Sequence, residues 1–64
     1  MEYDITLTIG DAAPVNTTLG EFFRINDHDD EIMDQRRGIC KALGRGERYK
    51  GASGWSWFEI AQAH

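Results

Sequence analysis

The residues best suited to chemistry in this chain are acidic and lie close together in the middle of the sequence. Such a segment could hold a divalent cation between carboxylate oxygens, or it could present negative charge to a basic partner. A calcium loop beginning at Asp27 requires glycine at its sixth position and glutamate at its twelfth, where this chain has Ile32 and Gly38. We therefore expect no metal and no cofactor, and we treat the segment as a candidate partner-binding surface. Its acids are Asp27, Asp29, Asp30, Glu31 and Asp34.

The same acids also suit the beginning of a helix. Each carboxylate in a first helical turn interacts favourably with the helix dipole, by ~0.3–1 kcal/mol. A helix start needs only one or two of them, however, and Asp30 and Asp34 repel each other at a spacing of four residues. Both interpretations, local electrostatics and partner binding, remain open at this point.

The bases of the chain are concentrated in its second half. Residues 1–35 contain nine acids and one base, whereas residues 36–64 contain six bases and two acids, which leaves a net charge of −4. The stretch around residues 45–50 combines bases with an aromatic residue and glycines, a composition that suits phosphate contact and base stacking. The overall acidity argues against nucleic acid as the main partner. The alternative binding residues are Arg45, Arg48, Lys50 and Trp55.

No residue combination indicates catalysis, and we expect the protein not to be an enzyme. Ser53 and Ser56 lack a nucleophile-elbow motif, and His28 has no evident orienting partner. The single cysteine, Cys40, excludes an intrachain disulfide and falls on the apolar side of a predicted helix, where we expect it to be a small core residue.

The first half of the chain predicts a strand followed by a short helix. Polar and apolar residues alternate over residues 2–9, which is typical of a half-buried strand with Tyr3, Ile5, Leu7 and Ile9 facing the core. Pro14 is incompatible with a central strand. Residues 18–21 have the form of a capping box, which predicts a helix from Thr18 to about Asn26.

A longer amphipathic helix is predicted from residue 29 to residue 43. Asp27 or Asp29 can cap its start, and Gly44 occupies the position where a left-handed residue commonly ends a helix. Its apolar side is formed by residues spaced three and four apart: Ile32, Met33, Arg36, Ile39, Cys40 and Leu43.

The last third predicts a hairpin. Residues 47–50 and 55–61 are the two strands, and residues 51–54 form a four-residue loop between them. The aromatic content of the second run favours a strand. A helix capped by Ser56, with Glu59 three residues later, is the alternative.

These elements predict one small α+β domain spanning residues 1–64. Its order is β-α-α-β-β, with about three antiparallel strands and both helices on one face of the sheet. The chain has no apolar run long enough to cross a membrane and an acidic start, so we expect a cytoplasmic protein without membrane partners. Its small size makes stability marginal, which leaves self-association open.

In size, acidity, cysteine usage and predicted architecture the chain resembles small phage-encoded inhibitors, the anti-CRISPR proteins in particular. The resemblance rests on these general properties and not on a shared motif. It implies a host protein with a basic groove, such as a nucleic-acid-binding effector, as the partner. The carboxylates between Asp27 and Asp34 would then take the place of nucleic-acid phosphates. A small nucleic-acid-binding regulator that uses the basic hairpin, or an oligomerising assembly subunit, is the alternative.

Overall fold

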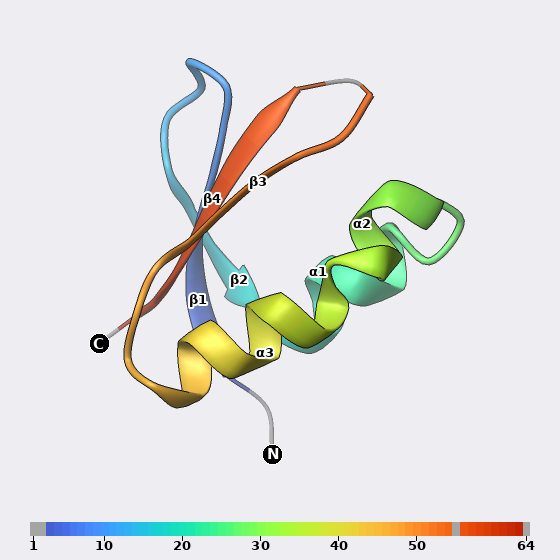
Figure 1. The fold of residues 1–64 in the computed structure, drawn as a ribbon. Coiled ribbons are helices and arrows are strands. Elements are labelled where there is room, and N and C mark those ends of the chain that lie inside the picture. The colour runs from blue at the N-terminus through green and yellow to red at the C-terminus, as the bar shows by residue number, and fades with distance from the viewer. Residues whose placement is uncertain (1–2, 55, 64) are drawn as a thin grey trace.

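A computed structural model describes residues 3–54 and 56–63 of the chain. Within these residues the chain forms a four-stranded antiparallel sheet and three helices, so the fold is α+β (Figure 1). The prediction of about three strands and two helices was too low in both counts. The elements are β1 (Asp4–Ile9), β2 (Val15–Thr18), α1 (Leu19–Ile25), α2 (Asp30–Asp34), α3 (Arg36–Gly44), β3 (Tyr49–Ala52) and β4 (Trp57–Gln62).

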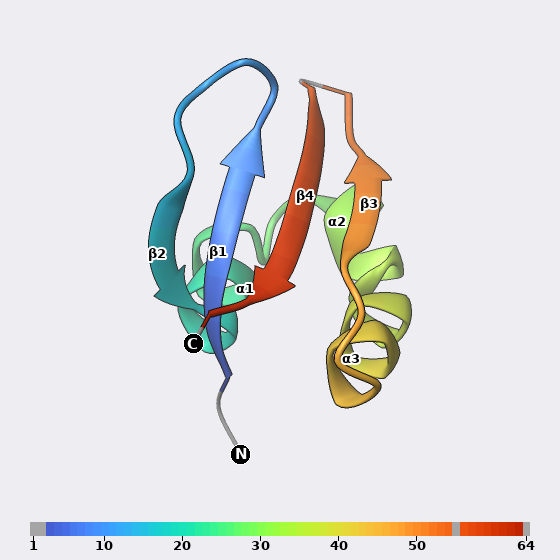
Figure 2. The same ribbon diagram turned by 90° about the vertical axis from the view of Figure 1, so that its left-hand side faces the viewer.

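The strand order in the sheet is β2-β1-β4-β3, so the first and last strands of the chain pair at its centre. All three helices lie on one face of the sheet, and in the part of the chain that the structure describes no element covers the other face (Figures 1 and 2). The sheet therefore has an open face, and its two edges are β2 and β3.

β1 confirms the alternating pattern of the sequence. Ile5 and Leu7 are buried against the helices, while Thr6 and Thr8 alternate with them and share the open face. On β4, Phe58 and Ile60 are buried, which places Trp57 on the open face.

β2 was not predicted. Its four residues are mostly polar and carry no apolar alternation that would mark them as a strand. These residues form a strand because their backbone pairs with β1, not because of their own strand propensity. Thr6 Oγ1 also donates a hydrogen bond to Asn16 Oδ1 at 3.2 Å. Pro14 directly precedes this edge strand, a position that a proline tolerates because it needs no ladder N–H there.

α1 begins where the capping residue predicts. The Glu21 N–H donates to Thr18 Oγ1 at 3.2 Å, and the helix ends at its C-cap, Asn26. The Glu21 side chain, however, pairs with Arg24 on the exposed surface rather than completing a capping box. This hydrogen bond from Arg24 lowers the pKa of the Glu21 carboxyl.

The predicted helix over residues 29–43 is in fact two helices, which meet at Gln35. In a continuous helix the Glu31 carbonyl would accept from the Gln35 N–H. Here Nε2 of the Gln35 side chain donates to that carbonyl at 2.9 Å. The backbone N–H of Gln35 donates to the carbonyl of Ile32 instead, at 3.0 Å. The side chain thus replaces one backbone bond, and the helix changes direction at this residue.

α3 ends one residue later than predicted. Gly44 is still helical, and the left-handed residue is Gly46, with φ of +74°. The Gly46 N–H donates to Leu43 at 3.0 Å and the Glu47 N–H to Ala42 at 2.9 Å. This pair of bonds is the Schellman arrangement, which satisfies carbonyls that the helix end would leave unpaired.

The hairpin of β3 and β4 is present, and the alternative helix capped by Ser56 is excluded by β4. Its loop is misplaced in the prediction, because Gly51 and Ala52 belong to β3 and the connection comprises residues 53–56. The Ser53 N–H donates to the Ser56 carbonyl at 2.9 Å and closes this connection.

The core lies between the sheet and the helices. Arg36 and Cys40, which we placed on the apolar side of the long helix, are exposed. The buried residues of α3 are Ile39 and Leu43, and Cys40 lies about 100° around the helix from Ile39. No described helix is long and apolar enough to cross a membrane. The buried side chains are Ile5, Leu7, Leu19, Phe22, Ile32, Ile39, Leu43, Phe58 and Ile60.

Candidate functional site

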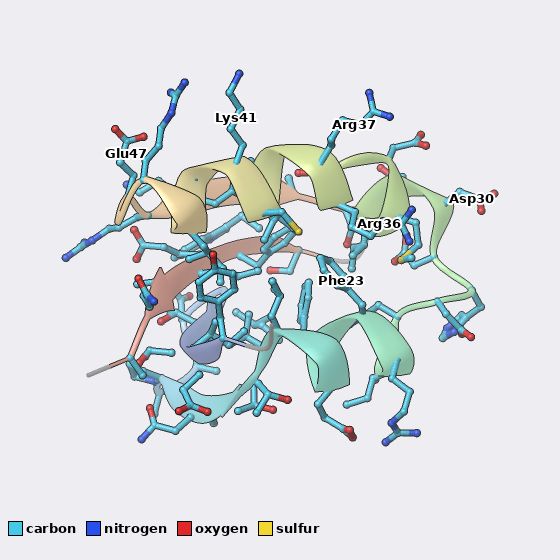
Figure 3. The ribbon with its side chains drawn as sticks, turned by 90° about the horizontal axis from the view of Figure 1, so that it is seen from below. Phe23, Asp30, Arg36, Arg37, Lys41 and Glu47 are labelled. Carbon is cyan, nitrogen blue, oxygen red and sulfur yellow. The ribbon has the colours of Figure 1, made fainter. Side chains whose placement is uncertain are left out.

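The acidic segment, residues 27–34, runs from the turn after α1 through α2. Asp27 lies in the turn, Asp29 is the N-cap of α2, and the other three acids are within the helix. Figure 3 shows Asp30 at the end of the molecule, pointing away from the sheet. The structure therefore brings all five predicted carboxylates to one end of the helical layer, but it gives them different tasks.

Asp29 has a structural role. Its Oδ1 accepts hydrogen bonds from the backbone N–H groups of Glu31, at 3.1 Å, and Ile32, at 3.3 Å. These two N–H groups would otherwise lack a partner at the start of α2. Asp29 is therefore the capping residue that the sequence offered as one of two candidates, and its carboxylate is already committed.

Glu31 is also committed, to a contact that is distant in sequence. Its Oε1 accepts a hydrogen bond from the Gly54 N–H at 3.0 Å, in the connection between β3 and β4. A Cβ at position 54 would lie 3.0 Å from the same oxygen, so glycine allows this close approach. The carboxylate of Glu31 thus attaches α2 to the end of the hairpin.

Gln35 is the central polar residue of this region, and sequence reasoning missed it. Besides binding the Glu31 carbonyl, its Nε2 donates to the Ala52 carbonyl at 2.8 Å, and its Oε1 accepts from the Tyr49 hydroxyl at 2.9 Å. A glutamine within a predicted helix carries no signal for partners that lie 14 and 17 residues away. Only the packing of α2 and α3 against β3 brings them together.

Three carboxylates of the segment remain at the surface. Asp27 has an exposed contact with His28, Oδ1 to Nδ1 at 3.7 Å, and a weaker electrostatic interaction with Arg24. Asp30 and Asp34 are exposed, and no hydrogen bond or ion pair connects either of them to another described residue. After the structural roles of Asp29 and Glu31 are assigned, these three define what we call the free acidic surface: Asp27, Asp30 and Asp34.

Carboxylates in this arrangement can form charge-assisted hydrogen bonds with lysine or arginine side chains of another molecule. Across residues 3–54 and 56–63, no group of three or more histidine, cysteine, aspartate or glutamate side chains is placed to hold a metal ion. The outer side of the neighbouring helix has the opposite charge, because Arg37 and Lys41 point away from the sheet there (Figure 3).

The alternative basic residues do not form one hairpin, contrary to the prediction. Arg45 is the C-cap of α3, Arg48 lies in the connection to β3, and Lys50 is within β3. Arg48 Nη1 is 3.6 Å from the carboxylate of Glu59, which neutralises part of its charge on the open face. Trp55 lies outside the described residues, whereas Trp57 is 48% exposed.

The chain matches no protein-family model, and no curated protein and no solved structure matches it.

Proposed function

We propose that this protein is a small non-catalytic binding protein whose free acidic surface contacts a basic groove on a protein partner. The observation that carries the proposal is the division of labour within residues 27–34. Asp29 and Glu31 hold α2 in place, while Asp27, Asp30 and Asp34 are exposed, and neither Asp30 nor Asp34 forms an ion pair with another described residue.

The repulsion between the exposed carboxylates of α2 destabilises the helix, which supports a role for them in binding rather than in folding. α2 has five residues and is already capped by Asp29, so its start needs no further acid. Asp30 and Asp34, four residues apart on the same helix, repel each other by about 0.2–0.5 kcal/mol. A local electrostatic field of one sign accelerates association with an oppositely charged surface, and this is the role that we assign to the exposed carboxylates.

The partner that fits is a host protein with a groove rich in lysine and arginine, such as a nucleic-acid-binding effector. In such a groove the carboxylates of α2 would take positions that phosphates otherwise occupy. The protein would then act as an inhibitor, in the manner of the small phage-encoded anti-CRISPR proteins that it resembles in size and charge.

Asp30→Asn/Asp34→Asn is the variant that tests the proposal. The substitutions keep the shape of both side chains and remove only their charge. Asp11→Asn is the matched control, because Asp11 is an exposed acid in the turn between β1 and β2, far from α2 (Figure 1). The wild type and both variants serve as bait in lysate of the native host, and the captured protein is then titrated by calorimetry.

The double variant should bind the captured partner at least tenfold more weakly at low salt, and the difference should shrink at high salt because screening weakens exposed charge pairs. Asp11→Asn should bind like the wild type, and all three proteins should melt at nearly the same temperature. Unchanged affinity in the double variant would contradict the proposal and would shift the interface to Arg45, Arg48, Lys50 and the open face.

A further inference from the structure

The two edges of the sheet are protected very differently. At β3, the Gln35 side chain covers the edge by donating to the Ala52 carbonyl at 2.8 Å, and Lys50 adds a charge. Charged side chains and covering groups are the usual means by which proteins prevent edge strands from pairing with other chains. β2, by contrast, has the sequence Val-Asn-Thr-Thr without any charge, and no described element lies beside its outer edge.

The backbone groups of β2 that point outward can be assigned from the ladder. The Leu19 N–H donates to the Tyr3 carbonyl at 2.9 Å, so this pair is hydrogen-bonded. Hydrogen-bonded pairs alternate along an antiparallel ladder, which directs the backbone groups of Thr17 to β1 as well. The N–H and the carbonyl of Asn16, together with the N–H of Thr18, therefore point away from β1 toward the free edge.

An apolar groove lies beside this edge, on the helix side of the sheet. It has a volume of about 250 Å³ and is lined mainly by Leu7, Ile9, Val15, Phe22 and Ile25. Two of these side chains are large exposed hydrophobic groups, with Val15 53% and Ile25 56% accessible to solvent. A strand that paired with β2 would place every second side chain over this groove.

We propose that the strand which pairs with β2 is β2 of a second copy of this chain, in an antiparallel arrangement centred on Asn16. In that register Asn16 lies opposite Asn16 of the second copy, and each donates its N–H to the other's carbonyl. The Thr18 N–H reaches the carbonyl of Pro14 of the second copy. Each copy thus donates two hydrogen bonds and accepts two, so the pair has four in all and is symmetric about a two-fold axis.

The ends of this strand pair leave no backbone group unsatisfied. Opposite the Thr18 carbonyl stands Pro14, which has no N–H to donate. The Thr18 carbonyl needs none, because Thr18 is the N-cap of α1 and its carbonyl accepts the first bond of that helix. The hydrogen-bonding pattern of residues 14–18 is thus complementary to itself, which identifies a second copy as the occupant.

Side chains and charge agree with this register. Val15 lies opposite Thr17 of the second copy, on the helix side, where both are close to the groove that contains Ile25. Residues 14–18 carry no charge, so the pairing opposes no like charges in spite of the net charge of −4. The two sheets would join into one of eight strands with all helices on the same side.

The mass in solution tests the proposal directly. Sedimentation equilibrium over a wide range of concentrations should show the mass rising from 7.3 kDa to twice that value. The amide hydrogens of Asn16 and Thr18 should exchange more slowly as the dimer fraction increases. In a mixture of labelled and unlabelled protein, an intermolecular NOE should connect the Hα of Val15 with the Hα of Thr17, since these atoms approach closely in a non-hydrogen-bonded pair.

Two variants locate the interface. Asn16→Pro removes the outward N–H but no N–H that bonds β1, while Asn16→Ser keeps the N–H and is the control. Val15→Lys is the second disrupting variant, and because this side chain is exposed it should not affect folding. Asn16→Pro and Val15→Lys should remain at 7.3 kDa with a folded amide spectrum, and Asn16→Ser should dimerise like the wild type.

Two outcomes would overturn the proposal. If the wild type stays at 7.3 kDa at every concentration, the β2 edge does not bind a second copy and is left for an extended strand of another protein. If the wild type dimerises and Val15→Lys dimerises equally well, the interface lies elsewhere. Neither outcome affects the proposed function, because the free acidic surface belongs to α2 and the turn before it.

Discussion

The side chain of Gln35 donates a hydrogen bond to the backbone carbonyl of Ala52 at 2.8 Å, across 17 positions of sequence. This one contact joins the point where α2 and α3 meet to the outer edge of β3. The same side chain binds the Tyr49 hydroxyl and the Glu31 carbonyl, so helix direction, edge protection and the position of α2 depend on a single residue.

Gln35→Ala tests this role. The substitution removes three hydrogen bonds, each with a net value of about 0.5–1.5 kcal/mol, and we expect the free energy of unfolding to fall by about 1.5–4.5 kcal/mol. Glu47→Ala is the control, because the side chain of Glu47 points into solvent (Figure 3). Urea denaturation measures both. Equal stability of Gln35→Ala and the wild type would show that these bonds are replaced by water at no cost.

Gly51→Ala should destabilise the protein through overpacking. A Cβ at this position would overlap Gln35 Oε1 and lie 2.8 Å from the ring of Phe58, which is fully buried and has no room to move. We expect a loss of about 1–3 kcal/mol in the free energy of unfolding.

Gly44→Ala is the matched control for Gly51→Ala. Its Cβ would meet only the Tyr3 hydroxyl at 3.9 Å, an ordinary contact, and alanine favours the helix by up to about 1 kcal/mol relative to glycine. Thermal denaturation should therefore rank the melting temperatures Gly44→Ala, wild type, Gly51→Ala from highest to lowest. The reverse order would contradict the packing described around Gly51.

Leu43→Ala tests the contact between α3 and the core. Leu43 is 1% exposed, and its truncation should reduce the free energy of unfolding by about 2–5 kcal/mol. Such a loss is a large part of the total stability of a domain this small. Lys41→Ala, on the outer side of the same helix, should change it by less than about 0.5 kcal/mol. Chemical denaturation distinguishes the two, and similar values would mean that α3 does not pack as described.

Cys40 should react with a thiol reagent while the protein is folded. The structure exposes this residue on α3, in contrast to the core position that the sequence suggested. We expect labelling in native buffer at a rate within about tenfold of that in denaturant, since exposure controls access to a thiol. Labelling only after unfolding would support the core position instead.

The features predicted correctly are those that short-range interactions determine. The alternation over β1, the cap at Thr18 and the cap at Asp29 each depend on residues within a few positions of one another. A strand with one buried face requires period two, and a capping oxygen must lie two or three residues before the N–H that donates to it. Such rules can be applied to a sequence without knowledge of the fold.

The acidic segment shows what such local rules cannot predict. Its five carboxylates could be identified from the sequence, but their division into committed and free groups could not. Glu31 accepts a hydrogen bond because the connection after β3 brings the Gly54 N–H to it, whereas the side chain of Asp30, its neighbour, contacts no hydrogen-bond or ion-pair partner among the described residues. The free acidic surface is thus a product of tertiary structure acting on a locally encoded cluster of charge.

By itself, the sequence of this protein determined its class, the inward face of β1 and the beginnings of two helices. Tertiary structure decided the rest: β2 exists because β1 pairs with it, and the long apolar pattern divides at Gln35 because that side chain takes the Glu31 carbonyl. The packing of α3 through Ile39 and Leu43 leaves Cys40 exposed. In each case the deciding hydrogen bond or strand pairing is one that local propensity does not specify, and its geometry exists only in the folded chain.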